Sequence, residues 1–114
     1  MPIIESNTVS AKNKAGGKGE IFITHLLTPK ELENKCAMFA RVKIPAGSSL
    51  GVHKHIGNTE TYHILSGTAA YTDNNETYTV KTGDTTFCAD GDSHGIENIG
   101  ADDLIFIALI INSD

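Results

Sequence analysis

Residues 47–67 read GSSLGVHKHIGNTETYHILSG, and the middle of this stretch carries a pair of histidines followed closely by a glutamate. His53 and His55 are two positions apart. On a strand such residues face the same side, with Cα atoms roughly 6.6–6.8 Å apart, so their imidazoles can converge on one ion. Residues 56–59, Ile-Gly-Asn-Thr, are typical of a turn. The chain can therefore reverse and bring Glu60 beside the pair.

His94 is a candidate fourth ligand, because it follows a turn at residues 90–92 and begins another predicted strand. Taken alone, a strand histidine or a surface glutamate is usually not a ligand. Together, three imidazoles and one carboxylate form a mixed nitrogen and oxygen set that suits Fe, Mn, Ni, Co or Zn better than Mg or Ca. The sequence therefore predicts a divalent metal held by His53, His55, Glu60 and His94.

Short strands are predicted along most of the chain. Runs of β-favouring or alternating residues, separated by turn signals, occur at residues 20–24, 38–44, 50–55, 61–65, 69–72, 77–81, 85–89, 94–99 and 103–111. Many short strands with almost no helical periodicity indicate an all-β sandwich or barrel.

The N-terminal part of the chain differs from the rest. Residues 1–19 are polar and end in Ala-Gly-Gly-Lys-Gly, so we expect an arm that is flexible or exchanges a strand, ahead of a single barrel at residues 20–114. Its lysines, Lys12, Lys14 and Lys18, are interpreted as solvating this arm. A short helical turn is predicted near residues 28–33, because a threonine, a proline and a glutamate there form a capping box.

Length and charge exclude several classes of function. A chain of 114 residues suits one domain, and a net charge of -5 without a basic cluster argues against a nucleic-acid partner. The longest apolar run, residues 104–111, is far shorter than the roughly 20 residues that span a bilayer. The N-terminus does not read as a signal peptide. We therefore expect a cytoplasmic protein with no membrane partner, in which Cys36 and Cys88 are separate thiols.

Both faces of the last predicted strand are apolar. Its two alternating sets are Leu104, Phe106, Ala108 and Ile110 on one face, and Ile105, Ile107, Leu109 and Ile111 on the other. A strand with one wet face would alternate apolar with polar residues, so both faces should be covered. The core covers one face, and either the N-terminal arm or a second subunit covers the other. The shortness of the chain favours a homodimer.

Two spaced patterns resemble the motifs of the cupin superfamily. The first, Gly47-x5-His53-x-His55-x4-Glu60-x6-Gly67, matches at every position. The second reads Gly83-x5-Ala89-x-Gly91-x2-His94-x3-Asn98. Its one departure is Ala89, where the family usually has proline, and this changes the stiffness of a turn and leaves the ligand in place. The patterns and the fifteen residues between them cover residues 47–98, nearly half of the chain.

The resemblance implies a small jelly-roll barrel (a double-stranded β-helix), usually dimeric, with one metal such as Fe, Mn, Ni or Zn on the four named residues. The resemblance also implies an activity of the kinds found among cupins of this size, which are those of dioxygenases, isomerases or epimerases, and lyases. The leading hypothesis is therefore a metal-dependent enzyme that acts on a small oxygenated molecule. The alternative is a non-catalytic module that binds or senses a small ligand, because few other polar pocket residues are evident.

Tyr62 is the candidate catalytic residue besides the ligands. It shares strand parity with Glu60, so its phenol can point into the pocket as a proton donor, although a core aromatic residue fits the same pattern. His63 has the opposite parity and is expected to face outward. His25 has no evident partner, and Asn98 is expected to anchor a turn.

Overall fold

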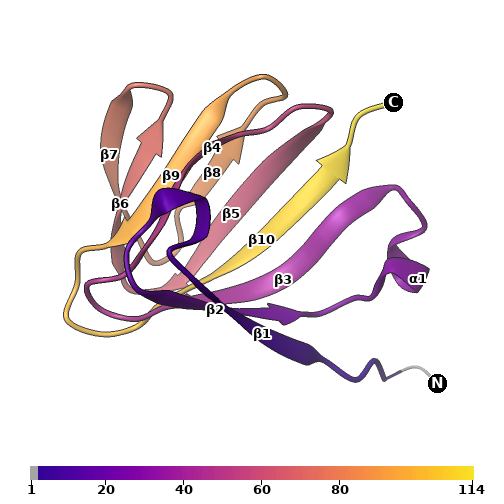
Figure 1. The fold of residues 1–114 in the computed structure, drawn as a ribbon, viewed down its shortest axis with the longest axis horizontal. Coiled ribbons are helices and arrows are strands. Elements are labelled where there is room, and N and C mark those ends of the chain that lie inside the picture. The colour runs from indigo at the N-terminus through magenta and orange to yellow at the C-terminus, as the bar shows by residue number, and fades with distance from the viewer. Residues whose placement is uncertain (1–2) are drawn as a thin grey trace.

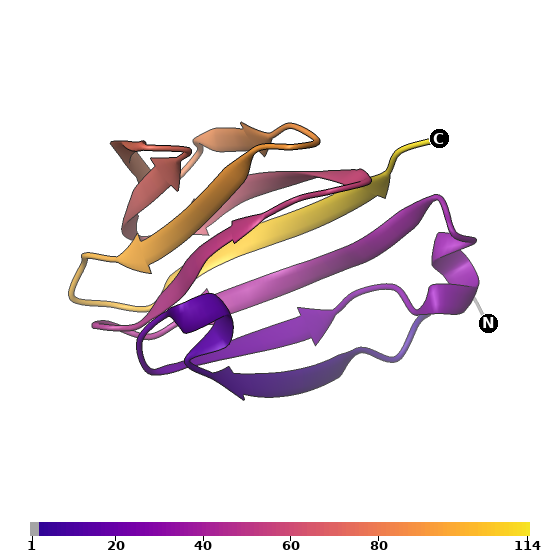
Figure 2. The same ribbon diagram turned by 45° about the horizontal axis from the view of Figure 1, so that its top comes forward.

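The structure is a computed structural model that describes residues 3–114. Those residues form ten strands in two antiparallel sheets, which face each other as a jelly roll (Figures 1 and 2). The strands are β1 (Asn7–Lys12), β2 (Glu20–His25), β3 (Cys36–Ile44), β4 (Ser49–Lys54), β5 (Asn58–Ser66), β6 (Thr68–Asp73), β7 (Glu76–Lys81), β8 (Thr85–Cys88), β9 (Ser93–Asn98) and β10 (Leu104–Asn112). The larger sheet has the order β1-β2-β3-β10-β5-β8, and the smaller has the order β4-β9-β6-β7. The all-β jelly-roll prediction is confirmed.

Two short helical segments accompany the strands, a 3-10 turn η1 (Lys14–Gly16) and a helix α1 (Pro29–Leu32). The helix falls within the range predicted for it. The Glu31 carboxylate accepts a hydrogen bond of 2.8 Å from the backbone N–H of Thr28, which satisfies a donor at the helix start. Neither segment, nor any other part of residues 3–114, forms a helix long and apolar enough to cross a lipid bilayer.

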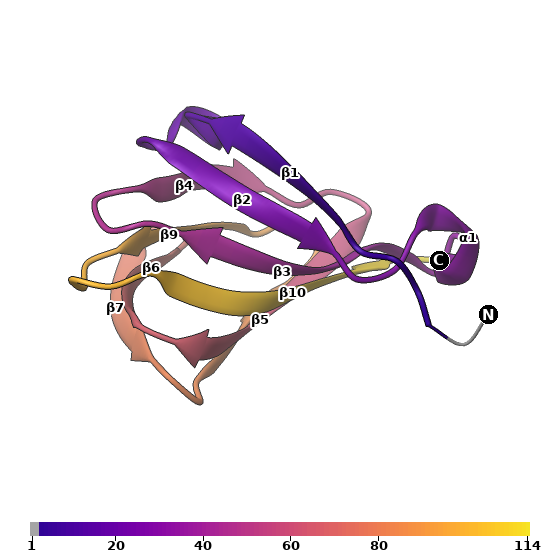
Figure 3. The ribbon, with the colours of Figure 1, turned by 90° about the horizontal axis from the view of Figure 1, so that it is seen from below.

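β1 lies within the segment that the sequence predicts to be an arm. It pairs antiparallel with β2, from Asn7 opposite His25 to Lys12 opposite Glu20, and forms the outer edge of the larger sheet (Figure 3). Most of its residues are exposed, which explains why no apolar pattern marks this strand in the sequence. Exchange of β1 with a second chain remains a prediction.

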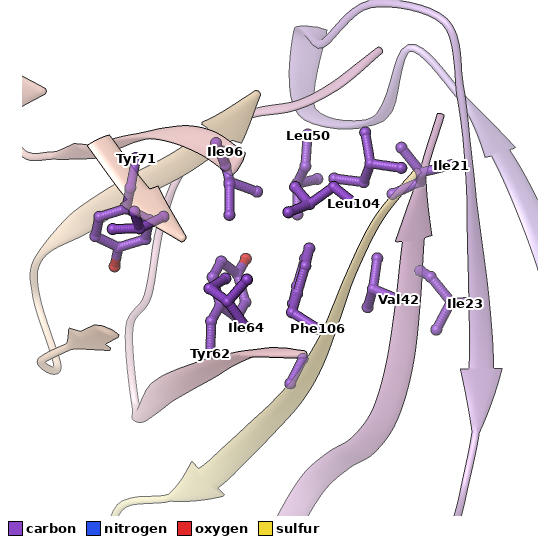
Figure 4. Packing of buried hydrophobic residues seen from close by; sticks show 14 of the residues in the cluster. Ile21, Ile23, Val42, Leu50, Tyr62, Ile64, Tyr71, Ile96, Leu104 and Phe106 are labelled. Carbon is purple, nitrogen blue, oxygen red and sulfur yellow. The ribbon is translucent and has the colours of Figure 1, made fainter. Parts of the chain in front are cut away.

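The core lies between the two sheets. The aromatic rings of Tyr62 and Phe106 rise from the larger sheet toward Leu50 and Ile96 on the smaller one (Figure 4), and their centroids are 4.5 Å apart. Tyr62 is 1% exposed and Phe106 is fully buried. The large inward side chains of β5 and β10 therefore fill the space between the two sheets.

The two faces of β10 are buried to different degrees. Leu104, Phe106 and Ala108 are completely buried against the core, whereas Ile105 and Ile107 on the opposite face are half-buried. β1 is separated from β10 by β2 and β3 in the same sheet, so it does not cover that outer face. Cover by a second subunit remains a prediction.

Candidate metal centre

Three strands bring four side chains to one point between the sheets. His53 on β4 lies directly opposite His94 on β9 in the antiparallel register. His55 follows the end of β4, and a tight turn then leads into β5, which carries Glu60. Gly57 adopts a φ of 81° in this turn, a conformation that glycine accepts at little cost. Local turn chemistry and sheet register together therefore create the cluster that the sequence predicts.

The donor atoms of these side chains converge closely. Oε1 of Glu60 lies 2.9 Å from Nε2 of His55, 2.9 Å from Nε2 of His94 and 3.6 Å from Nε2 of His53. All four donor atoms lie within 4.8 Å of one another. His55, Glu60 and His94 are buried and His53 is partly exposed, so the cluster is reached from the side of His53.

The second nitrogen of each imidazole has its own partner. Nδ1 of His53 lies 2.8 Å from the carbonyl oxygen of Gly51, and Nδ1 of His55 lies 2.7 Å from Oδ1 of Asn58. Both partners are acceptors, so each Nδ1 carries the proton and each Nε2 keeps its lone pair. Nδ1 of His94 lies 2.7 Å from the hydroxyl oxygen of Tyr71, which can accept in the same way.

Electrostatics inside the cluster favour an ionised carboxylate. Burial raises the pKa of Glu60, but contacts with the imidazoles of His53 and His94 outweigh this and bring its pKa to about 2. Burial lowers the pKa of His94 more than the carboxylate raises it, which favours the neutral imidazole that a metal requires. The pKa of His53 is raised. Burial lowers it, and so does the nearby charge of Lys14, but the hydrogen bonds with Glu60 and the Gly51 carbonyl and the charge of Glu60 outweigh both.

This donor set fits a divalent transition metal. Three imidazole nitrogens with satisfied second nitrogens and one ionised carboxylate are the ligands that Mn, Fe, Co, Ni or Zn accept. The structure thus brings together all four residues singled out from the sequence, His53, His55, Glu60 and His94, as a cluster that can hold a metal ion.

Tyr62 packs directly on this cluster. Its ring stacks on the imidazole of His94, with centroids 4.8 Å apart and planes 19° apart. Its hydroxyl is buried and has no hydrogen-bond partner among residues 3–114. Burial raises the pKa of Tyr62 well above its ordinary value, so the phenol keeps its proton. A buried hydroxyl without a partner beside the cluster is available to a bound molecule.

Other side chains considered in the sequence lie outside the cluster. His63 is exposed and its Nδ1 lies 2.9 Å from the hydroxyl of Thr85, while His25 lies on β2 and does not join the four. Asn98 anchors a turn as predicted, because its amide donates to the carbonyls of Ile44 and Asp102. Its Oδ1 also accepts a hydrogen bond from the N–H of the glycine that follows β9.

A cavity of about 350 Å³ opens beside the cluster. Three of the cluster residues, Tyr62 and several apolar side chains line it, and so do Lys14 and Ala15 of η1. The N-terminal segment therefore forms part of the cavity wall. Lys14 is exposed to solvent, as its interpretation in the sequence requires, and it lines the cavity as well.

Sequence reasoning missed three contributors to the site: Tyr71, Asn58 and Lys14. Asn58 could have been found, because it lies three residues after His55 in the predicted turn. Tyr71 and Lys14 depend on strand register and on the path of η1, and the local sequence signals neither.

Comparisons with known proteins agree with this geometry. The family model described as "Cupin domain" matches residues 40–110. An "Oxalate-binding protein" from Thermotoga maritima is 48% identical over 99 residues, which cover 87% of this chain and 82% of that protein. An uncharacterised protein from Methanocaldococcus jannaschii is 36% identical over 100 residues, which cover 88% of this chain and 79% of that protein.

A solved structure is similar over nearly the whole chain. The crystal structure described as a predicted oxalate decarboxylase from Thermotoga maritima superposes with a TM-score of 0.91 at 45% sequence identity. The match covers 95% of this chain and 94% of that one, so it includes the N-terminal segment as well as the barrel. Jelly-roll topology, the two spaced motifs and these matches lead to one conclusion: the chain belongs to the cupin domain family.

Proposed function

We propose that this protein is a metal-dependent cupin enzyme whose substrate is a small carboxylate bound beside His53, His55, Glu60 and His94. The observation that carries the proposal is the convergence of three Nε2 atoms and one carboxylate oxygen within 4.8 Å, next to an open cavity. Fe, Mn, Ni and Zn are all proposed as candidates for the metal, because the ligand set alone does not select among them.

A metal ion on these four residues would supply Lewis acidity toward the oxygen atoms of a bound ligand. Glu60 is the only ligand with a formal charge, so it offsets only part of the charge of a divalent ion. A net positive charge at the head of the cavity favours an anion. The names of two similar proteins, one oxalate-binding and one a predicted oxalate decarboxylase, support a carboxylate as that anion.

Tyr62 is the proposed proton donor. Its side chain lines the cavity that also contains His53 and Glu60, and its hydroxyl is buried without a partner among the described residues. A phenol in that place can donate a hydrogen bond to an oxygen atom of a bound ligand, or a proton in a lyase or isomerase reaction. In an oxygenase reaction the same hydroxyl would orient the substrate.

A non-catalytic ligand-binding role is the second candidate. The wall of the cavity is mainly apolar, and Tyr62 has the only hydroxyl among its described residues. Few general acids or bases are therefore at hand, and one similar protein is named for binding oxalate. This role requires the same metal and the same ligand class, so turnover separates the two candidates.

Turnover is tested with protein loaded in turn with Mn, Fe, Ni or Zn and given oxalate or pyruvate. Release of carbon dioxide and consumption of oxygen are measured, and binding is followed by calorimetry. We expect metal-dependent turnover that falls at least tenfold in Y62F while metal content is unchanged. Binding without turnover for all four metals would favour the non-catalytic role, and no binding of either acid would contradict both.

We also propose that the protein is a homodimer. On the outer face of β10, Ile105 and Ile107 are half-buried. Leu65 on β5 and Phe87 on β8, the next two strands of the same sheet, are 43% and 60% exposed. An apolar sheet face of this kind is typical of an interface. Light scattering coupled to size exclusion at micromolar concentration tests this: a mass of two chains is expected, and a mass of one would contradict it.

A cytoplasmic location is proposed on chemical grounds. Cys36 is partly buried and Cys88 is buried, and they are free thiols, as the sequence predicts. Thiols remain reduced in the cytosol. Fractionation of cells that express the natural gene, with detection by antibody, would place the protein.

A further inference from the structure

The cavity beside the metal cluster has two chemically different parts. At one end are His53, His55 and Glu60, and the remaining wall is largely built from aliphatic and aromatic side chains. Ile23 and Val42 stand on neighbouring strands of the larger sheet, and Phe106 is one strand further along (Figure 4). A polar end and an apolar wall in one cavity suit a ligand that has a charged head and an apolar body.

Among the described residues of the lining, Lys14 contributes the only cationic side chain apart from the imidazoles. Its side chain is exposed to solvent and also lines the cavity, so it lies where the cavity meets solvent. Within residues 3–114 its ammonium forms no ion pair, whereas the nearby Lys18 pairs with Glu97 at 3.4 Å. An unpaired ammonium at the mouth of a cavity is a binding partner for a carboxylate.

The backbone of η1 fixes the position of Lys14. On one side of it Asn13 has a φ of 52°, and on the other Ala15 has a φ of 54°, so the chain turns sharply around this residue. The turn packs on β4 without space for side chains between them. A Cβ atom at Gly51 would lie 2.0 Å from the carbonyl oxygen of Ala15, and one at Gly17 would lie 2.2 Å from that of Ser49.

Hydrogen bonds to β4 strengthen this attachment. The backbone N–H of Lys18 donates to Oγ of Ser49 at 2.9 Å, and the N–H of Ser49 donates to the carbonyl of Lys18 at 2.9 Å. The strand that carries His53 therefore also holds the segment that carries Lys14. The position of the Lys14 backbone relative to His53 is therefore built into the fold.

From this arrangement we infer that the ligand is a carboxylate with an apolar body, held between the metal cluster and Lys14, and that Lys14 determines specificity for the anion. The inference rests on the proposed function and narrows its substrate class to acids such as α-keto acids with aliphatic side chains. Oxalate has no apolar body and would leave the wall of the cavity in contact with water.

The size of the cavity supports a ligand larger than oxalate. A volume of about 350 Å³ corresponds to roughly a dozen water molecules at about 30 Å³ each. Met38, Val42 and Ile110 line the part of the wall formed by β3 and β10. Displacing water from such a surface by methylene groups gains affinity in proportion to the apolar area that is covered.

The inference is tested by calorimetry on metal-loaded protein with a graded series of acids: oxalate, pyruvate, α-ketobutyrate, α-ketovalerate and α-ketoisocaproate. Each added methylene should tighten binding by about fourfold until the cavity is filled. α-Ketoisocaproate should therefore bind at least tenfold more tightly than oxalate. Equal or tighter binding of oxalate would overturn the inference.

Lys14 is tested with a matched pair of variants. K14M should bind every acid about threefold to tenfold more weakly. K12M removes the same charge from β1, outside the cavity, and should bind like the wild type. K14R should restore most of the affinity. The neutral methyl ester of α-ketoisocaproate should bind equally to the wild type and K14M, and equal acid affinities for K14M and K12M would overturn the role of Lys14.

Metal content measured on the same samples separates this inference from the proposed function. If the wild type carries about one ion per chain and binds oxalate best, the metal centre stands and the inference of an apolar ligand fails. If no metal is bound, the proposed function itself fails.

Discussion

The hydroxyl oxygen of Tyr71 lies 2.7 Å from Nδ1 of His94, across the pairing of β6 with β9. This contact fixes the orientation of an imidazole that is completely buried. It also aims Nε2 of His94 at Glu60, 2.9 Å away. Tyr71 is therefore a positioning residue for the candidate metal centre, although it does not reach the centre itself.

Replacement of Tyr71 by phenylalanine should weaken metal binding by about tenfold to a hundredfold, because His94 loses the partner that orients it. Competition with a chelator of known affinity measures this. Y78F is the matched control, since Tyr78 is exposed and its hydroxyl, within residues 3–114, donates only to Glu76 on its own strand. If Y71F and Y78F bind metal equally well, Tyr71 has no positioning role.

Removal of the Asn98 side chain should destabilise the fold. Asn98 is only 3% exposed. The N98A variant removes the hydrogen-bond partner of three backbone groups, which are the carbonyls of Ile44 and Asp102 and the N–H of Gly100. We expect the free energy of unfolding to fall by about 2–4 kcal/mol in urea titrations. N75A, in an exposed turn, is the control and should change it by less than about 0.5 kcal/mol. Equal stabilities would refute the anchoring role.

A methyl group at Gly51 should displace η1 from β4, because its Cβ atom would lie 2.0 Å from a backbone oxygen. G51A should lower the free energy of unfolding by about 1–3 kcal/mol. It should also speed cleavage by trypsin after Lys14 or Lys18. At Gly100 the nearest atom to an added Cβ would be 3.5 Å away, so G100A is the matched control. Identical trypsin cleavage of the two variants would show that η1 does not depend on this close approach.

Asp90 should make the stability depend on pH in the acid range. The backbone N–H of Gly57, followed by the hydroxyl of Ser113, lowers the pKa of Asp90 from its ordinary value of 3.8. Because the folded pKa lies below the unfolded one, this stabilisation is complete above pH 3.8 and disappears as the pH falls through the folded value. D90A should therefore be less stable than the wild type at pH 6, and the difference should shrink below pH 3.8.

Urea titrations at several pH values measure this difference. The control is D103A, because the Asp103 carboxylate is exposed and makes no side-chain hydrogen bond within the described part of the chain. A gap between wild type and D90A that is constant with pH would show that the hydrogen bonds to Asp90 do not act on its ionisation.

The metal cluster could be predicted from the sequence because local patterns position most of it. His53, His55 and Glu60 lie within eight residues, joined by a turn that contains Gly57, and His94 follows a recognisable turn before β9. The spacing of residues along strands and turns brings the first three side chains together, and His94 joins them through the register of β4 against β9.

Contributors that depend on tertiary structure could not be predicted in this way. Tyr71 reaches His94 only through the register of β6 against β9. Lys14 reaches the cavity because Asn13 and Ala15, which are not glycines, adopt positive φ angles, and no sequence rule anticipates this at both positions. β1 escaped prediction because it is almost entirely exposed, so it has no buried face to create an apolar alternation.

The central claim is that His53, His55, Glu60 and His94 hold one metal ion. Elemental analysis of purified protein, compared with the double variant H53A/H94A and with the matched variant H25A/H63A, tests it most directly. We expect about one transition metal ion per chain in the wild type and in H25A/H63A, and none in H53A/H94A, with the same β circular dichroism spectrum for all three. Metal retained by H53A/H94A, or a wild type that stays empty after incubation with Mn, Fe, Ni and Zn, would contradict the account.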